Sequence, residues 1–265
     1  MFKTYLVCYL CFHLVGEFYL QSERRADKKC KKISSFAKHV LIYWISLTIL
    51  SLLVHTREFM ISIQSLCLAH TFIDITKFFY IRKKREKISI NHIRNIYIID
   101  QVSHVITFIA AAYIMTIHTT GLTFDHRILK FFTTVNLNPI VVLSWITMLL
   151  AILKPANITI KQLLTIYRPD STISLNIMNL PSNASAADME TSADTNAGAF
   201  IGSLERLVIL IFLSLGQYSA IGLILTAKSI ARYNRITTDR AFAEYYLLGT
   251  LLSMIYVLFL YRLIM

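Results

Sequence analysis

The segment Phe59–Tyr80, FMISIQSLCLAHTFIDITKFFY, decides the fold class. A helix needs roughly 20 predominantly apolar residues to cross the hydrocarbon core of a bilayer, and this segment meets that requirement. It ends at the basic run Arg82-Lys83-Lys84-Arg85. An apolar run with positive charge at one end is typical of a transmembrane helix.

Five further apolar segments predict the same structure, and they are Tyr5–Leu20, His39–Leu53, Ile96–Ile117, Phe132–Leu153 and Phe242–Met265. Of the 265 residues, 55% are hydrophobic and 16% are charged, whereas about a quarter of an ordinary soluble domain is charged. The sequence therefore predicts an all-α, polytopic integral membrane bundle of about six transmembrane helices, for which lipid is the main solvent.

The net charge of +12 predicts orientation in the membrane and not nucleic-acid binding. The basic residues lie in short loops beside apolar segments, and no basic module with interleaved aromatic residues accompanies them. Loops rich in Lys and Arg remain in the cytoplasm. We therefore expect the Glu23–Lys32 and Arg82–Lys87 loops to be cytoplasmic and the N-terminus to lie outside.

Composition divides the chain into three parts. Residues 1–153 form the predicted N-terminal five-helix membrane domain. Residues 154–200 are polar and lack apolar periodicity, which predicts a mobile loop. Residues 201–265 form the predicted C-terminal membrane hairpin and last helix.

The apolar run Leu207–Ala227 is long enough to cross the membrane once, but a single crossing would put Lys228 and Arg232 outside. A re-entrant hairpin that breaks near Gly216-Gln217-Tyr218 would return these basic residues to the cytoplasmic side, which is tolerated where the backbone is buried in protein. The hairpin is the favoured interpretation, with a single crossing as the alternative.

Histidines and carboxylates interrupt the apolar segments in a repeated pattern. An ionisable residue at the bilayer centre costs on the order of 3 kcal/mol, so its placement is informative. Residues four apart lie on one face of a helix. Three pairs have this spacing: His13 and Glu17, His70 and Asp74, and Asp100 and His104.

Each pair lies within about three helical turns of a basic residue, so the three pairs are expected at one depth near the cytoplasmic boundary. Imidazole and carboxylate are ligands of zinc, manganese and iron. This pattern predicts a divalent transition metal bound by five residues, His13, His70, Asp74, Asp100 and His104, with Glu17 as the general base for a metal-bound water. A polar network that fixes helix packing is the alternative.

Supporting roles around this cluster are expected for Gln21, His39, Lys77 and Gln101. For Lys77 the favoured interpretation is instead a side chain that extends to the membrane interface. The C-terminal part has its own charged residues, and Glu205 or Glu244 is expected to neutralise Lys228 there. In one interpretation these charged residues form ion pairs with one another. In the other, Lys228, Arg232 and Arg206 bind an anionic lipid headgroup or phosphate.

Several motifs resemble the bacterial membrane family known as domain of unknown function 3307. They are His13-Leu14-Val15-Gly16-Glu17-Phe18-Tyr19-Leu20-Gln21, the stretch from His70 to Lys77, and Asp100-Gln101-Val102-Ser103-His104. Three C-terminal motifs are similar to extended members of that family: Gly202-Ser203-Leu204-Glu205-Arg206, Ala227-Lys228-Ser229-Ile230-Ala231-Arg232 and the stretch from Ala243 to Ser253.

The resemblance implies a multi-pass protein of the prokaryotic inner membrane, but it supplies no reaction. The His–acid pairs are also loosely similar to those of membrane-bound metal-dependent hydrolases, an analogy by association only. The leading hypothesis is a metal-dependent hydrolase that acts on a lipid-linked or phosphate-bearing substrate near the cytoplasmic leaflet. The alternatives are a transport or signalling component that binds a cation or relays protons, and a structural scaffold.

The predicted orientation can be checked by cysteine labelling. Cys30 lies in the Glu23–Lys32 loop, so a thiol reagent confined to the outer face should leave it unmodified in intact cells, and a permeant reagent should label it. A Lys84→Cys variant should behave in the same way. Labelling of either position from outside would reverse the predicted topology.

Overall fold

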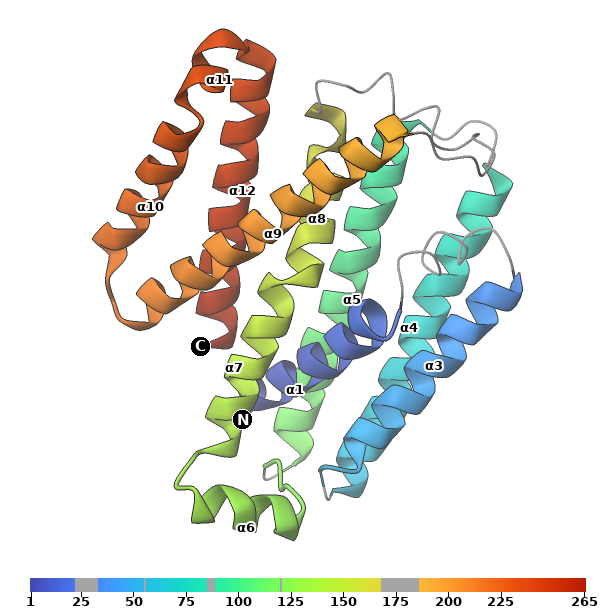
Figure 1. The fold of residues 1–265 in the computed structure, drawn as a ribbon. Helices are drawn as coiled ribbons and strands as arrows, with labels where there is room; N and C mark the ends of the chain where they lie inside the picture. The colour runs from blue at the N-terminus through green and yellow to red at the C-terminus, as the bar shows by residue number, and fades with distance from the viewer. Residues whose placement is uncertain (22–32, 55, 85–88, 120, 168–185) are drawn as a thin grey trace. The chain divides into compact units, whose positions relative to one another are not determined.

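The computed structural model describes residues 1–21, 33–54, 56–84, 89–119, 121–167 and 186–265, with only the backbone for residues 186–197. Helices account for almost all of this described part, and no named strand occurs in it, which confirms the predicted all-α class (Figure 1). The loop Glu23–Lys32 and residues 85–87 of the second basic loop lie outside the described residues.

The N-terminal elements are α1 (Phe2–Leu14), the π-helical turn η1 (Val15–Tyr19), α3 (Ile33–Ser51), α4 (Arg57–Lys83), α5 (Ile90–His118), α6 (His126–Thr134) and α7 (Pro139–Ile152). The remaining elements are α8 (Lys154–Leu164), the 3₁₀ turn η2 (Thr165–Tyr167), α9 (Ala186–Ser214), α10 (Tyr218–Ala231), α11 (Tyr233–Thr238) and α12 (Arg240–Ile264).

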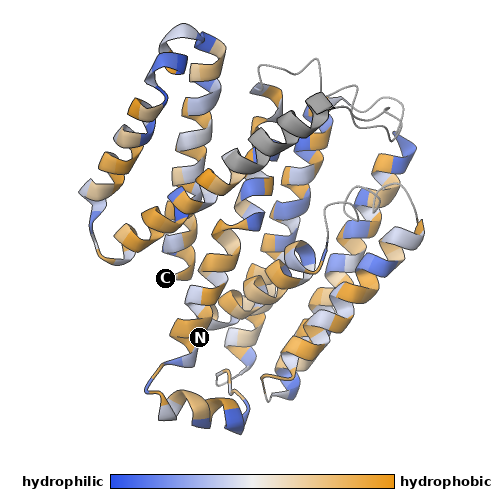
Figure 2. Cartoon of the chain, in the orientation of Figure 1, coloured by the Kyte–Doolittle hydropathy of each residue, from blue (hydrophilic) through white to orange (hydrophobic). Residues whose placement is uncertain are grey.

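Five helical segments of the described chain are long and apolar enough to cross a membrane: Ile33–Ser51, Arg57–Lys83, Ile90–His118, Pro139–Tyr167 and Arg240–Ile264. Apolar residues predominate along them, with bands of hydrophilic residues between (Figure 2). Large apolar side chains such as Phe72, which is 72% exposed, cover their outer faces. The sixth expected span is shorter, because α1 ends at Leu14 and continues only as η1.

The chain divides into two compact units, of which the first comprises Met1–Leu150. In this unit α1 packs against α5 and α3, while α4 packs against both α3 and α5 (Figure 1). Aromatic side chains hold α1 to α4, since the rings of Tyr9 and Phe59 stack at 5.6 Å and the Tyr9 hydroxyl lies 2.6 Å from Ser62 Oγ. The helices that carry the three His–acid pairs are therefore neighbours.

The predicted helix Phe132–Leu153 is wrong at its start, because the chain turns between α6 and α7. Asn136 has a positive φ of 53°, a conformation that Asn tolerates better than most residues. Asn138 Oδ1 accepts a hydrogen bond from the backbone N–H of Ile140 at 2.9 Å, and Pro139 is the first residue of α7. Proline is favoured there because it has no N–H to leave unpaired.

The second compact unit comprises Ala151–Leu263. The loop predicted for residues 154–200 is wrong at both of its ends, which are helical. The chain from Lys154 to Tyr167 is helical, with Pro155 in the first turn of α8. Helix α9 already begins at Ala186. Residues 168–185, which include Asn183, lie outside the described residues. The polar composition indicated a loop here, although Pro155 is a residue typical of the first turn of a helix.

The predicted break in Leu207–Ala227 is confirmed. Helix α9 ends at Ser214, and Gly216 takes a φ of +69°, where glycine has no steric penalty, before α10 begins at Tyr218. The two helices pack against each other as a hairpin. Lys228 Nζ lies 2.6 Å from Glu205 Oε2, so Glu205 is the predicted partner of Lys228. Glu244 instead pairs with Arg240 at an exposed position.

Arg206 is buried and hydrogen-bonded within the second unit, which gives no support to its predicted role in binding substrate. The side chain is 2% exposed. Its guanidinium donates hydrogen bonds to the carbonyl oxygen of Ile152 at 2.6 Å, to Asn157 Oδ1, to Ser203 Oγ at 3.2 Å and to Ser253 Oγ at 3.4 Å. These bonds tie α9 to α7, α8 and α12.

Replacing Arg206 by Ala should destabilise the protein by about 3 kcal/mol, because it leaves several buried acceptors without a donor. Arg240→Ala is the matched control, since Arg240 is 93% exposed and its ion pair with Glu244 contributes little. Thermal unfolding in detergent should show a clear drop in midpoint for Arg206→Ala alone. Equal midpoints for the two variants would refute the structural role.

Candidate metal centre

The π-helical turn η1 positions Glu17. The backbone N–H of Leu20 bonds to the carbonyl oxygen of Val15 at 3.0 Å, an i→i+5 bond that widens the turn. Gly16 lets this turn approach α3 closely, because a Cβ built at Gly16 would lie 2.8 Å from Tyr43 Cδ2. The absence of a side chain at Gly16 therefore brings Glu17 against α3 and α4.

Glu17, His39, His70 and Asp74 form the first group of possible ligands. His39 Nε2 lies 3.1 Å from Glu17 Oε2 and 3.3 Å from Asp74 Oδ2. His70 Nε2 lies 3.3 Å from Glu17 Oε2. One ligand atom from each residue lies within 4.8 Å of the others, so the group could hold a metal ion.

Asp74, Asp100 and His104 form a second group with the same closeness. Lys77 Nζ donates to Asp100 Oδ2 at 2.7 Å, whereas the sequence favoured a side chain that extends to the interface. Gln101 Nε2 donates to the same oxygen at 3.2 Å. Both residues therefore lie beside a carboxylate of the cluster, and their supporting role stays a prediction.

His13 is near the cluster but belongs to neither group of ligands. Its Nδ1 lies 3.0 Å from the hydroxyl of Tyr43, and its ring centroid is 5.1 Å from that of His104 and 5.5 Å from that of His70. The sequence predicted His13 and Glu17 on one face of a regular helix, but the chain is π-helical from Val15 to Tyr19, which changes the α-helical spacing after Leu14.

His39 and Tyr43 are more central than the sequence indicated. His39 was expected at the depth of the cluster and in a supporting role, and it contacts two carboxylates of the first group. Tyr43 was missed: its ring stacks on His70 with a centroid distance of 3.7 Å, and it is completely buried. The spacing of four residues between His39 and Tyr43 was the available signal. Gln21 is buried just beyond η1.

The ligand candidates are nearly inaccessible. The side chains of His70 and Asp74 are each 1% exposed, while Glu17 is 13% exposed. Both ring nitrogens of His70, His104 Nε2 and Asp100 Oδ1 have no hydrogen-bond partner among the described residues. Buried polar atoms normally have a hydrogen-bond partner. A cation at this position would interact with atoms for which the protein supplies no hydrogen bond.

The cluster lies within the helices and not at their ends. At 1.5 Å per residue, His39 is about 9 Å from the start of α3, Asp74 about 13 Å from the end of α4 and Asp100 about 15 Å from the start of α5. These are the helix ends that adjoin the basic loops. All three distances are within about three helical turns, the separation from the basic loops that the sequence indicated.

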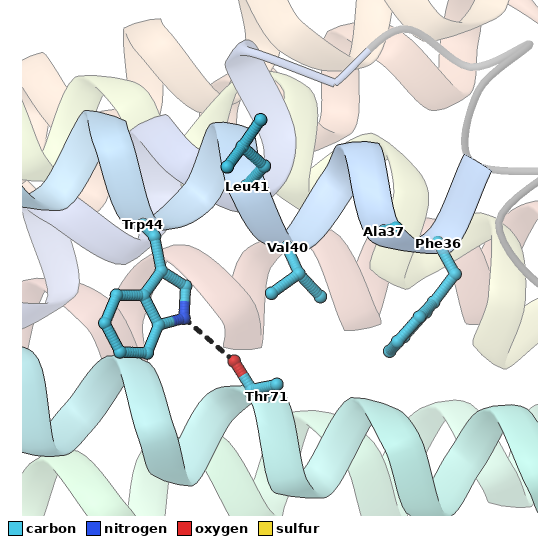
Figure 3. A pocket seen from close by; sticks show the side chains of 6 residues that line it. All are labelled: Phe36, Ala37, Val40, Leu41, Trp44 and Thr71. Carbon is cyan, nitrogen blue, oxygen red and sulfur yellow. Dashed lines mark hydrogen bonds between the residues drawn. The ribbon is translucent and has the colours of Figure 1, made fainter. Parts of the chain in front are cut away.

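A separate apolar groove lies on the outer side of α3 and α4, and no residue of the cluster lines it. It is lined by Phe36, Ala37, Val40, Leu41, Trp44 and Thr71 (Figure 3). The indole N–H of Trp44 in α3 donates to Thr71 Oγ1 in α4 at 3.0 Å and links the two helices. Its apolar lining suits contact with lipid and offers no groups for chemistry.

The close approach at Gly16 can be tested by substitution. Gly16→Ala should lower the thermal unfolding midpoint, because the added methyl overlaps the fully buried Tyr43 ring and overpacking costs about 1–3 kcal/mol. Gly222→Ala in α10 is the control, since a Cβ there meets nothing within 4 Å. An unchanged midpoint for Gly16→Ala would show that η1 does not need this contact.

Comparison with known proteins identifies the first part of the chain. Residues 5–133 match the family described as "Protein of unknown function (DUF3307)". The match includes every residue of the two ligand groups; the C-terminal motifs lie beyond it. No curated protein and no solved structure matches the chain. The segment 5–133 is thus a domain of the DUF3307 family, set in a helical protein with apolar segments suited to a membrane.

Proposed function

We propose that this protein is a membrane-embedded, metal-dependent hydrolase that acts on a phosphate-bearing or lipid-linked substrate. The observation that supports the proposal most is the buried cluster of two kinds of ligand, imidazole and carboxylate, on neighbouring helices. Nitrogen and oxygen ligands of this kind suit zinc, manganese and iron. A scaffold needs helix contacts, but it does not need buried ring nitrogens without hydrogen bonds.

The ligand set resembles that of a catalytic site more than that of a structural one. His39, His70 and Asp74 supply three ligand atoms, and catalytic metal sites keep a further position open for water or substrate. A divalent cation makes bound water more acidic and polarises a phosphoryl oxygen. No cysteine belongs to either group, which argues against a structural zinc site of the thiolate type.

Glu17 is the best candidate for the general base. It is the most exposed residue of its group, at 13% against 4% for His39 and 1% for His70, so it lies nearest to a path for substrate. In the proposed reaction Glu17 takes a proton from water as the water oxygen bonds to phosphorus. The ester P–O bond breaks, and the leaving oxygen receives that proton.

A location near the cytoplasmic leaflet of a prokaryotic inner membrane, with the N-terminus outside, completes the proposal. It rests on the basic loops beside α3, α4 and α5 and on the positive-inside rule. Lys228 and Arg232 remain the predicted holders of an anionic group. Lys228 is only partly available for this role, because Glu205 neutralises it.

The metal and the base can be tested separately. Wild-type protein, purified in detergent without chelator, should contain a divalent transition metal by elemental analysis, and His70→Ala should lose metal because it removes a ligand. Glu17→Gln should retain metal but release phosphate from phosphatidic acid micelles at least about 100-fold more slowly, since general bases contribute that much or more.

His118→Ala is the control for both measurements, because His118 is exposed in the last turn of α5, away from the cluster. It should leave metal content and activity unchanged. Wild-type protein that holds no transition metal and takes none up on titration would contradict the enzyme proposal and leave a structural polar network. Bound metal without any hydrolysis of phosphate esters would favour a cation-binding role in transport or signalling.

A further inference from the structure

Among the described residues of the first unit, two groups of possible ligands occur, and they share a residue. The first contains Glu17, His39, His70 and Asp74, and the second contains Asp74, Asp100 and His104. Asp74 is the common member. A carboxylate has two oxygens, and both oxygens of Asp74 are buried at this position. We propose that the cluster is a two-metal centre in which Asp74 bridges two divalent cations.

The proposal rests on the metal-binding part of the proposed function and extends it. The first cation would be held by His39, His70 and one oxygen of Asp74. Their ligand atoms already converge: His39 Nε2 lies 3.3 Å from Asp74 Oδ2, and His70 Nδ1 lies 3.7 Å from the same oxygen. Contacts of this length between ligands leave room for a cation after small adjustments of the side chains.

The second cation would be held by Asp74, Asp100 and His104. Lys77 and Gln101 both donate to Asp100 Oδ2 and leave Oδ1 without a hydrogen-bond partner among the described residues. The two supporting residues thus orient the carboxylate so that one oxygen is available. This is the usual arrangement for a metal ligand that is fixed by its neighbours.

The tautomer of His104 also suits a metal ligand. Its Nδ1 lies 2.7 Å from the carbonyl oxygen of Asp100, which can only accept, so Nδ1 carries the proton. Nε2 then holds a lone pair, and it has no hydrogen-bond partner in the described part of the chain. A backbone carbonyl that binds one nitrogen of a histidine commonly prepares the other nitrogen for a metal.

The net charge of the cluster explains why the binding of a second cation would depend on bound substrate. With neutral histidines, the carboxylates of Glu17, Asp74 and Asp100 and the ammonium of Lys77 leave a net charge of −2. One divalent cation neutralises the cluster. A second leaves a surplus of two positive charges in a buried place, which a phosphate dianion would balance. Two-metal centres with ions about 3.5–4 Å apart bind both sides of a phosphoryl group in this way.

The experiment is a titration of the purified, metal-free protein with Mn²⁺, in the presence and absence of inorganic phosphate. Two Mn²⁺ ions should bind per chain, and phosphate should tighten the second at least about tenfold. Electron paramagnetic resonance should then show a spin-coupled pair in place of the spectrum of isolated ions, because the bridging carboxylate keeps the ions within about 4 Å.

Variants assign the two positions. His104→Ala and His39→Ala should each bind one Mn²⁺ and lose the coupled spectrum, Asp74→Asn should weaken both positions, and His118→Ala should bind two. Circular dichroism and size-exclusion chromatography establish that each variant is folded. Binding of a single Mn²⁺ with and without phosphate would overturn the two-metal centre, as would two ions without magnetic coupling.

These outcomes are distinct from those that decide the proposed function. One bound ion together with phosphate release would keep the hydrolase and reject the two-metal centre. Two coupled ions without phosphate release would keep the two-metal centre and reject the hydrolase. Absence of any bound ion would reject both proposals.

Discussion

The cost of burying charged and polar groups in an apolar helix bundle controls the structure of the first unit. Each ionisable residue placed in the membrane interior costs on the order of 3 kcal/mol, and this unit buries Asp74, Asp100, His70 and His104 almost completely. Gathering these side chains at one depth lets opposite charges and hydrogen-bond partners meet. The packing of α1 and α3 around α4 and α5 serves this requirement.

Several local features make the gathering possible. The π-helical turn η1 redirects the chain after α1, and Gly16 allows it to reach α3, so that Glu17 meets His39 and His70 from a third helix. The ring of Tyr43 stacks on His70 and its hydroxyl hydrogen-bonds with His13, so one side chain positions two histidines. Lys77 offsets the charge of Asp100. A cation would add the remaining positive charge and fill the unsatisfied nitrogen positions.

Apolar length and charge placement were enough to predict the helical membrane class, the break at Gly216-Gln217 and the partnership of Lys228 with Glu205. The spacing of four residues identified His70 with Asp74 and Asp100 with His104, because α4 and α5 are regular helices. The same rule does not describe the spacing of His13 and Glu17, because a π-helical turn lies between them and packs through Gly16 against Tyr43 of another helix. The burial of Arg206 was not predicted for a similar reason: its buried acceptors come from three other helices.

Imidazole and carboxylate groups of the first unit are proposed to bind a transition metal. The most direct measurement is X-ray absorption at the metal edge on protein purified without chelator, followed by the same measurement on His70→Ala. The wild-type spectrum should show nitrogen and oxygen neighbours at about 2.0–2.2 Å with the multiple scattering of imidazole rings, and the variant should lose that imidazole signal. A spectrum without imidazole scattering, a sulfur neighbour at about 2.3 Å, or an unchanged spectrum for His70→Ala would contradict the proposal.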